Sequence, residues 1–241
     1  MASAKPFFNW MRTLLRFFFY LLYHPFAFTY DLVAATVSLG RWKDWVWSVV
    51  PFIEGRRVLE IGHGPGHLQK VLLSRKLAAV GLDESAPMGR LARRNLMRYL
   101  ASPGASSTTS TQNIDYTQIR LARGVSQHLP FDDSSFDTVV ATFPTEYIYD
   151  PATLQEAYRV LLPNGRLVIL PGATILGRGL LDQVMALLFR ITGQTPPNLA
   201  EIIHQRSRQP FVNAGFQVET HVLDIRSSRV YILVATKIHE K

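Results

Sequence analysis

A glycine-rich turn between a predicted strand and a predicted helix is the segment best suited to bind a ligand. The apolar run 58–61 leads into the sequence GHGPG at 62–66, and a helical pattern begins at His67. Glycines in such a turn let a ligand approach the backbone, whose amides face it. The spacing differs from the G-x-G-x-x-G dinucleotide fingerprint, because His67 occupies a position where that pattern requires glycine. Glu60, inside the strand, is also not part of that fingerprint.

A carboxylate at the end of the next predicted strand supports the same interpretation. Asp83 follows the apolar run 78–82 and lies 21 positions after Gly62. In a doubly wound sheet a carboxylate at this place can reach the two hydroxyls of a ribose. The glycines alone fit a simple turn equally well, and an exposed aspartate at a strand end is common. Together, the turn and the acid predict a ligand of the adenosine type.

The elements around these residues alternate between strand and helix. This order is typical of a parallel sheet with helical crossovers. Two later strands, 216–223 and 229–236, are joined by the short segment 224–228 and predict an antiparallel hairpin. We therefore expect an α/β fold: a doubly wound, mostly parallel seven-stranded sheet with an antiparallel last strand, behind an N-terminal helical arm. The other strands are predicted at 58–61, 78–82, 119–123, 136–141 and 166–170, and helices at 67–76, 87–100, 152–162 and 199–213.

Four segments in this order resemble the class I S-adenosylmethionine-dependent methyltransferases. They are VLEIGHGPGHL, VGLDES, LPFDDSSFDTVVATF and LQEAYRVLLPNGRLVIL, and the resemblance covers roughly residues 56–172. Upstream, YDLV at 30–33 and SLGRW at 38–42 are similar to the N-terminal segment of the ubiquinone/menaquinone-biosynthesis C-methyltransferases and their phospholipid N-methyltransferase relatives. The resemblance implies an enzyme that uses S-adenosylmethionine to methylate a small, hydrophobic or lipid-like acceptor of the quinone or phospholipid class.

The resemblance also implies which residues contact the cofactor. Glu60 and the glycine turn would hold the methionine moiety, and Asp83 would bind the ribose. Residues of three later segments would lie beside the adenine or face the sulfonium, and Tyr30 would close over the cofactor. The full cofactor-binding set is Tyr30, Glu60, Gly62, His63, Gly64, Gly66, Asp83, Met88, Ser126, Gln127, Thr142 and Phe143.

Glu146, Tyr147 and Tyr30 are the catalytic candidates. Methyl transfer from a sulfonium mainly requires alignment of the nucleophile, the methyl group and the sulfur. A general base is needed only if the acceptor carries a proton, and Glu146 is the candidate for that role or for orienting the acceptor. The tyrosine rings can stabilise the sulfonium by cation–π contact.

Two departures from the family pattern leave the acceptor open. Val125 stands where many relatives have an acid that accepts the adenine amino group, and FPTEY at 143–147 differs from the usual quinone-methylating pattern. A methyltransferase for a soluble small molecule and a catalytically silent adenosylmethionine-binding protein therefore stay as alternatives. No Asn-Pro-Pro-Tyr motif supports methylation of nucleic-acid bases. The scattered histidines and the absence of cysteine show no metal-ligand spacing.

Basic residues near the N-terminus are interleaved with aromatic ones. The chain has a formal net charge of +8, and residues 7–23 predict a helix with a narrow basic stripe on a wide apolar surface. This helix either packs on the catalytic domain as a lid or lies on an anionic membrane. The uncharged run 17–30 is too short to span a bilayer, so we expect a cytoplasmic protein, attached to membranes peripherally if at all.

The predicted domain organisation separates an N-terminal arm, 1–50, from a methyltransferase domain, 51–241. Within the domain, 175–195 predicts a lid helix, and 101–113 predicts a flexible loop because its residues are small and polar. The oligomeric state is left open. A second basic cluster comprises Arg90, Arg93, Arg94 and Arg98 in the predicted helix 87–100.

Overall fold

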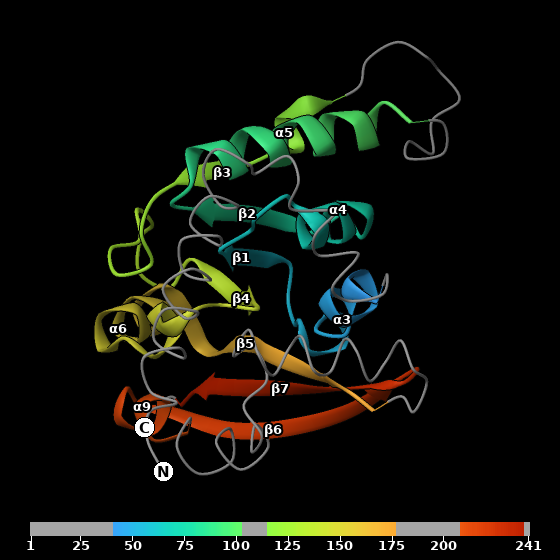
Figure 1. Cartoon of the computed structure of the whole chain (residues 1–241). Coiled ribbons are helices and arrows are strands. Elements are labelled where there is room, and N and C mark those ends of the chain that lie inside the picture. Colours follow the sequence, from blue (N-terminus) through green and yellow to red (C-terminus); the bar gives the residue numbers. More distant parts are fainter. Residues whose placement is uncertain (1–40, 103–114, 177–207, 239–241) are drawn as a thin grey trace, which may run out of the picture.

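A computed structural model describes residues 41–102, 115–176 and 208–238 and contains one seven-stranded sheet (Figure 1). The strand order is β3-β2-β1-β4-β5-β7-β6. Neighbours from β3 to β5 run parallel, whereas β7 runs antiparallel to both β5 and β6. This confirms the predicted fold class. The strands are β1 Arg57–Ile61, β2 Ala78–Asp83, β3 Leu121–Arg123, β4 Phe136–Thr142, β5 Leu161–Ile175, β6 Phe216–Ile225 and β7 Ser228–Lys237.

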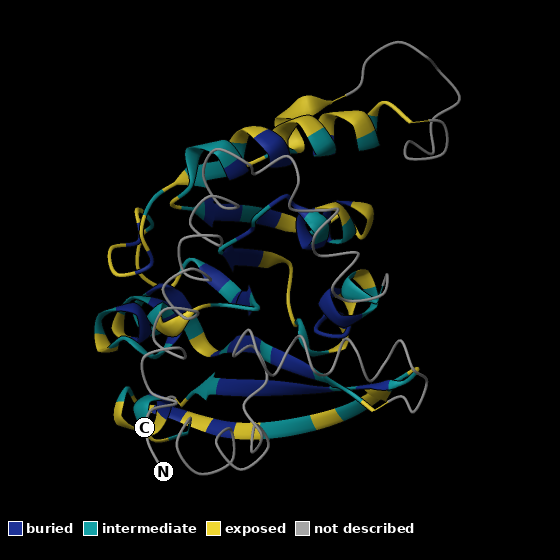
Figure 2. Ribbon diagram, viewed as in Figure 1, coloured by how far each residue is buried: buried dark blue, intermediate teal, exposed yellow. Residues whose placement is uncertain are grey.

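Helices pack on both faces of the sheet. Alternate strand residues point to opposite faces, so Leu59 and Val139 join the core beneath α6 and α9, while Val58 and Val140 join the core beneath α3 and α4. The central strands are accordingly buried on both sides (Figure 2). The described helices are α3 Trp42–Trp47, α4 His67–Ser74, α5 Ala86–Leu100, α6 Pro151–Val160 and α9 Arg208–Asn213, with 3-10 turns η2 Val50–Phe52, η3 Tyr116–Gln118 and η4 Glu146–Tyr149.

The strand order reverses direction between β1 and β4. The chain moves from β1 outward to β2 and β3, and then returns to the other side of β1 as β4. In open α/β sheets, ligands bind beyond the carboxyl ends of the strands at such a switch point. The glycine turn after β1 and the residues after β4 both lie at this edge.

Three element boundaries differ from the sequence prediction for local reasons. β3 begins at Leu121 and not at Ile119, whose amide closes η3 by donating to the Tyr116 carbonyl at 3.1 Å. Asp115 caps η3 by accepting a hydrogen bond from the Thr117 amide at 2.9 Å. β5 begins at Leu161, and its register with β4 shifts between Phe136 and Thr138, where the turn residues 163–165 interrupt the pairing. The β6–β7 hairpin closes in only two residues, Arg226 and Ser227.

Several predictions lie outside the described residues. They are the helix 7–23, residues 1–40 of the arm, Tyr30, residues 103–113 of the loop, residues 177–195 of the lid helix and residues 199–207 of the helix 199–213. The lid helix does not begin at Ile175 as predicted, because that residue still pairs with Ser228 as the end of β5. Among the helices that the structure does describe, none is long and apolar enough to cross a membrane.

Candidate active site

The glycine turn that joins β1 to α4 forms the floor of the candidate site. The Gly62 amide donates to the Leu82 carbonyl at 2.8 Å, which ties the turn to β2. Gly62, Gly64 and Gly66 all have positive φ, a conformation that L side chains rarely adopt. A Cβ added to Gly64 would meet no protein atom within 4 Å. The backbone is therefore open at Gly64, as close approach of a ligand requires.

Asp83 holds the turn to the start of α5. One carboxylate oxygen accepts from the Gly64 amide at 2.9 Å, and the other accepts from the Ser85 amide at 2.8 Å. A carboxylate has about four lone-pair sites, so these two bonds leave acceptor capacity for further donors. The side chain is only half-buried. Asp83 can therefore stabilise the turn and accept hydrogen bonds from ligand hydroxyls at the same time.

Glu60 is buried directly beneath the turn. Its side chain is 1% exposed and accepts a hydrogen bond from Gln69 Nε2 of α4 at 2.9 Å. Burial raises the pKa of Glu60 to about 8; the Gln69 hydrogen bond opposes this shift and the negative charge of Asp83 adds to it. Glu60 therefore contacts Gln69 of α4, behind the turn, and is not exposed at the surface of the candidate site.

His63 is the second buried ionisable group of the turn. Its Nδ1 lies 2.8 Å from the Gly64 carbonyl, which can only accept, so Nδ1 carries the proton. Burial lowers the pKa of His63, with the charge of Asp83 opposing the shift, and so favours the neutral imidazole. Nε2 is buried and has no hydrogen-bond partner among the described residues. The ring fits only because β2 has glycine at position 81, where a Cβ would lie 2.9 Å from His63 Cδ2.

The loop after β3 lies beside Asp83. The Gly124 amide donates to the Asp83 carbonyl at 3.2 Å. Further along the loop, Ser126 is buried with its hydroxyl 2.9 Å from Thr153 Oγ1. Gln127 donates to Asp150, the N-cap of α6, at 3.1 Å. Ser126 and Gln127, which were predicted to lie beside the adenine, are thus held to the first turn of α6. Val125 is exposed.

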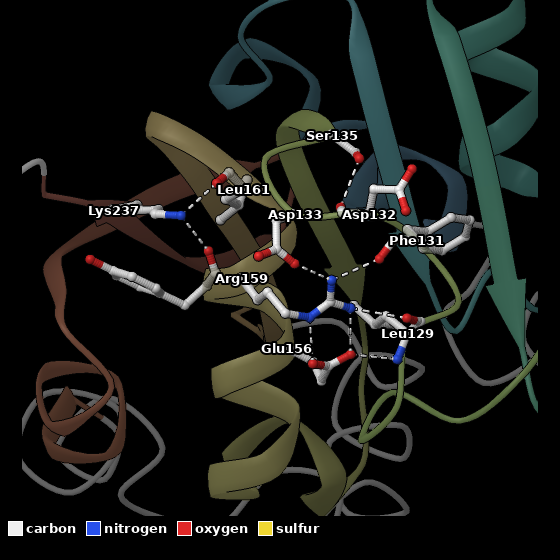
Figure 3. Close-up of polar contacts among 10 residues, drawn as sticks. Leu129, Phe131, Asp132, Asp133, Ser135, Glu156, Arg159, Leu161 and Lys237 are labelled. Carbon is white, nitrogen blue, oxygen red and sulfur yellow. Dashed lines mark hydrogen bonds and ion pairs between the residues drawn. The ribbon is translucent and has the colours of Figure 1, made fainter.

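A charged network anchors the rest of this loop to α6 (Figure 3). Arg159 donates to the carbonyls of Leu129 and Phe131 at 3.0 and 2.8 Å, and it forms ion pairs with Glu156 and Asp133 at 2.7 Å. Glu156 also accepts from the Leu129 amide. Hydrogen bonding from Arg159 is the main cause of the lowered pKa of Glu156. The network therefore keeps Glu156 ionised and positions the segment between β3 and β4.

The residues after β4 approach the turn from its other side. The Tyr147 hydroxyl donates to the Ile61 carbonyl at 3.5 Å and would lie 2.7 Å from a Cβ at Gly62. Phe143 instead stacks on Trp42 of α3, with ring centroids 4.1 Å apart. Glu146 is exposed on η4.

The structure thus brings Glu60, the glycine turn, Asp83 and Tyr147 to one edge of the sheet. It places two other predicted cofactor residues differently: Met88 is fully buried in α5, and the Phe143 ring faces α3. Thr142 is half-buried at the end of β4. None of these positions tests a binding role directly, so the roles stay predictions.

Two supporting residues had not been expected from the sequence. Gln69 lies on the buried face of α4 between the core residues Leu68 and Leu72, and Asn95 of α5 donates to the Pro65 carbonyl at 3.1 Å. A polar residue at a buried helical position was the signal that could have identified Gln69, because such a side chain needs a buried partner.

Comparison with known proteins agrees with this architecture. Residues 59–169 match the family model described as "Methyltransferase domain". The demethylmenaquinone methyltransferase of Lactiplantibacillus plantarum is 32% identical over 157 residues, which cover 62% of this chain and 60% of that protein. The ubiquinone/menaquinone biosynthesis C-methyltransferase of Blochmanniella floridana is 28% identical over 156 residues, which cover 62% of this chain and 56% of that protein. The chain thus spans less than two thirds of the length of these relatives.

Solved structures share the fold at lower sequence identity. A SAM-dependent methyltransferase from Thermotoga maritima superposes with a TM-score of 0.55 at 18% identity, covering 90% of this chain and 98% of that one. This coverage is wider than the matched residues 59–169 alone.

Proposed function

We propose that the chain methylates a small hydrophobic acceptor of the quinone class, with S-adenosylmethionine as the methyl donor. Two findings support this proposal: residues 59–169 match the methyltransferase domain model, and the chain shares the fold of a SAM-dependent methyltransferase. The observation that carries the proposal is the glycine turn, which is open at Gly64 and held by the half-buried carboxylate of Asp83. An open glycine turn beside one carboxylate suits an amino-acid moiety next to a ribose.

The cofactor supplies a methyl group that is activated by attachment to a sulfonium. The remaining task of the protein is to align the acceptor with that methyl group and to exclude water. In this proposal the methionine moiety lies against the open backbone at Gly64, Asp83 accepts from the ribose hydroxyls, and Glu60 stabilises the turn through Gln69.

Tyr147 is the side chain best placed to contact the reacting groups. Its hydroxyl lies over Gly62, at the carboxyl edge of β1. From there the ring can offer a face to a sulfonium, and the hydroxyl can hydrogen-bond to an acceptor oxygen. Glu146, exposed on the same 3-10 turn, is proposed as the residue that orients the acceptor or accepts its proton. Tyr30 keeps its predicted lid role as a proposal, since it lies outside the described residues.

The quinone class is favoured by the two relatives described above, both of which carry names of quinone-biosynthesis enzymes. The test uses full-length protein and S-adenosylmethionine with an isotopically labelled methyl group. Demethylated quinones of short side chain, phosphatidylethanolamine and a soluble amine are offered separately, and methylated products are read by mass spectrometry. Transfer to a quinone, lost in Asp83→Ala, supports the proposal.

Two other outcomes would each overturn part of it. Transfer only to the soluble amine would favour the alternative of a soluble substrate. Calorimetric binding of S-adenosylhomocysteine without transfer to any acceptor would favour a silent binding protein, the alternative suggested by Val125.

A further inference from the structure

The outward face of α5 carries four arginines that the proposed methyl transfer does not use. Arg90, Arg93, Arg94 and Arg98 are all exposed, and the helix contains no acidic residue. With 3.6 residues per turn they fall within an arc of about 140° on one side of the helix. The opposite side of the helix is buried against the sheet, so the arginines form one continuous outer face.

No carboxylate neutralises this face within the part of the chain that the structure describes. The four arginines form none of the ion pairs found there, whereas five other arginines each meet a carboxylate at 2.7 to 3.2 Å. An unpaired guanidinium keeps its five N–H donors for an external anion. The concentration of unpaired charge on one helix therefore indicates an anionic binding partner.

Two neighbouring residues define the surface further. Arg123 of β3 donates through Nε to the Glu84 carbonyl at 3.0 Å, which places a fifth guanidinium beside the start of α5. Met97 is 37% exposed and lies one helical turn beyond Arg93 and Arg94, in the middle of the basic face. The face thus combines positive charge with a central apolar side chain.

We propose that the arginine face of α5 docks onto the anionic headgroups of a lipid surface. A helix that lies in a membrane interface presents basic residues to headgroups and apolar residues to the acyl boundary. A bilayer offers an apolar environment in which the Met97 side chain can be buried, whereas a phosphate backbone offers none. We therefore favour a lipid surface over nucleic acid. The helix begins three residues after Asp83, so docking there would hold the candidate site close to the lipid. The proposal does not depend on the identity of the methyl acceptor.

The test measures binding of full-length protein to vesicles of equal parts phosphatidylcholine and phosphatidylserine, with pure phosphatidylcholine vesicles as the neutral comparison. The variant Arg93→Gln/Arg94→Gln removes two charges from the face. Each basic residue near an anionic leaflet contributes about fivefold in affinity, so we expect binding to weaken about 25-fold. Met97→Ser should weaken binding without any change in charge. Binding of the unaltered protein should also fall as salt is raised.

The matched control is Arg56→Gln/Arg75→Gln, which removes the same charge from exposed positions outside α5, shortly before β1 and β2. It should keep nearly full affinity. An equal loss of vesicle affinity in both double variants would show that net charge alone drives binding. Unchanged affinity in Arg93→Gln/Arg94→Gln would show that another segment binds the lipid. Either result overturns the proposal. So would a labelled oligonucleotide that binds through Arg93 and Arg94 while vesicle binding is unaffected. Thermal unfolding confirms that all variants fold.

Discussion

At the scale of single residues, Glu60 is the group whose protonation should most affect stability. Its pKa is raised from 4.5 to about 8 by burial, so the folded state favours the protonated form. Its contribution to the free energy of unfolding is therefore fully present below pH 4.5 and is lost as the pH rises through about 8. Glu60→Gln, which cannot ionise, should gain stability relative to the unaltered chain over this window. Each unit of pKa shift corresponds to about 1.4 kcal/mol.

The measurement is urea unfolding of both proteins at intervals from pH 5 to pH 8.5. A difference in unfolding free energy that does not change with pH would show that Glu60 keeps an ordinary pKa in the folded protein. Glu156→Gln serves as the control, because hydrogen bonding from Arg159 is the main cause of the lowered pKa of Glu156. Its contribution is already present above the ordinary carboxyl pKa and should vary little in this range.

Asp83, also at the residue scale, should contribute both to ligand affinity and to the stability of the glycine turn. Asp83→Ala removes the acceptors for the Gly64 and Ser85 amides and for the proposed ribose hydroxyls. We expect affinity for S-adenosylhomocysteine, measured by calorimetry, to fall by about 1–3 kcal/mol, the cost of leaving such donors without an acceptor. Asp115→Ala removes an exposed acid that caps η3 and should leave the affinity unchanged. Full affinity in Asp83→Ala would refute the assignment of Asp83.

At the scale of elements, the packing of β2 against the glycine turn depends on the missing side chain at Gly81. A Cβ there would lie 2.9 Å from both His63 Cδ2 and Leu121 Cδ2. Gly81→Ala should therefore destabilise the protein by about 1–3 kcal/mol through overpacking. Gly89→Ala is the matched control, because its Cβ would meet nothing within 4 Å on α5 and should stabilise the helix by up to about 1 kcal/mol. Equal unfolding midpoints for the two variants would contradict this account.

At the scale of the whole molecule, the alternation of apolar runs was enough to predict a seven-stranded sheet and its direction changes. Strand boundaries were less accurate where local hydrogen bonds decide them, as at η3, which Asp115 caps. The turn and Asp83 were predictable because glycine and strand-end acids have characteristic spacings. The Gln69–Glu60 and Asn95–Pro65 contacts were not, because they join α4 to β1 and α5 to the turn through packing that no local spacing encodes. The same holds for Phe143, whose ring is placed by its contact with Trp42.

Ligand binding should stabilise the whole domain, since the proposed contacts link β1, β2 and the start of α5. A ligand that binds only the folded state at about 100 times its Kd adds about 2.7 kcal/mol. For a chain of this size, that corresponds to a rise of roughly 5–10 °C in Tm. S-adenosylhomocysteine should therefore raise the Tm by about this amount, and the rise should shrink in Asp83→Ala. NAD should produce no rise, because the turn lacks the third glycine of the dinucleotide fingerprint, His67 standing in its place. A rise with NAD and none with S-adenosylhomocysteine would mean that the turn serves a dinucleotide and that the proposed methyl donor is wrong.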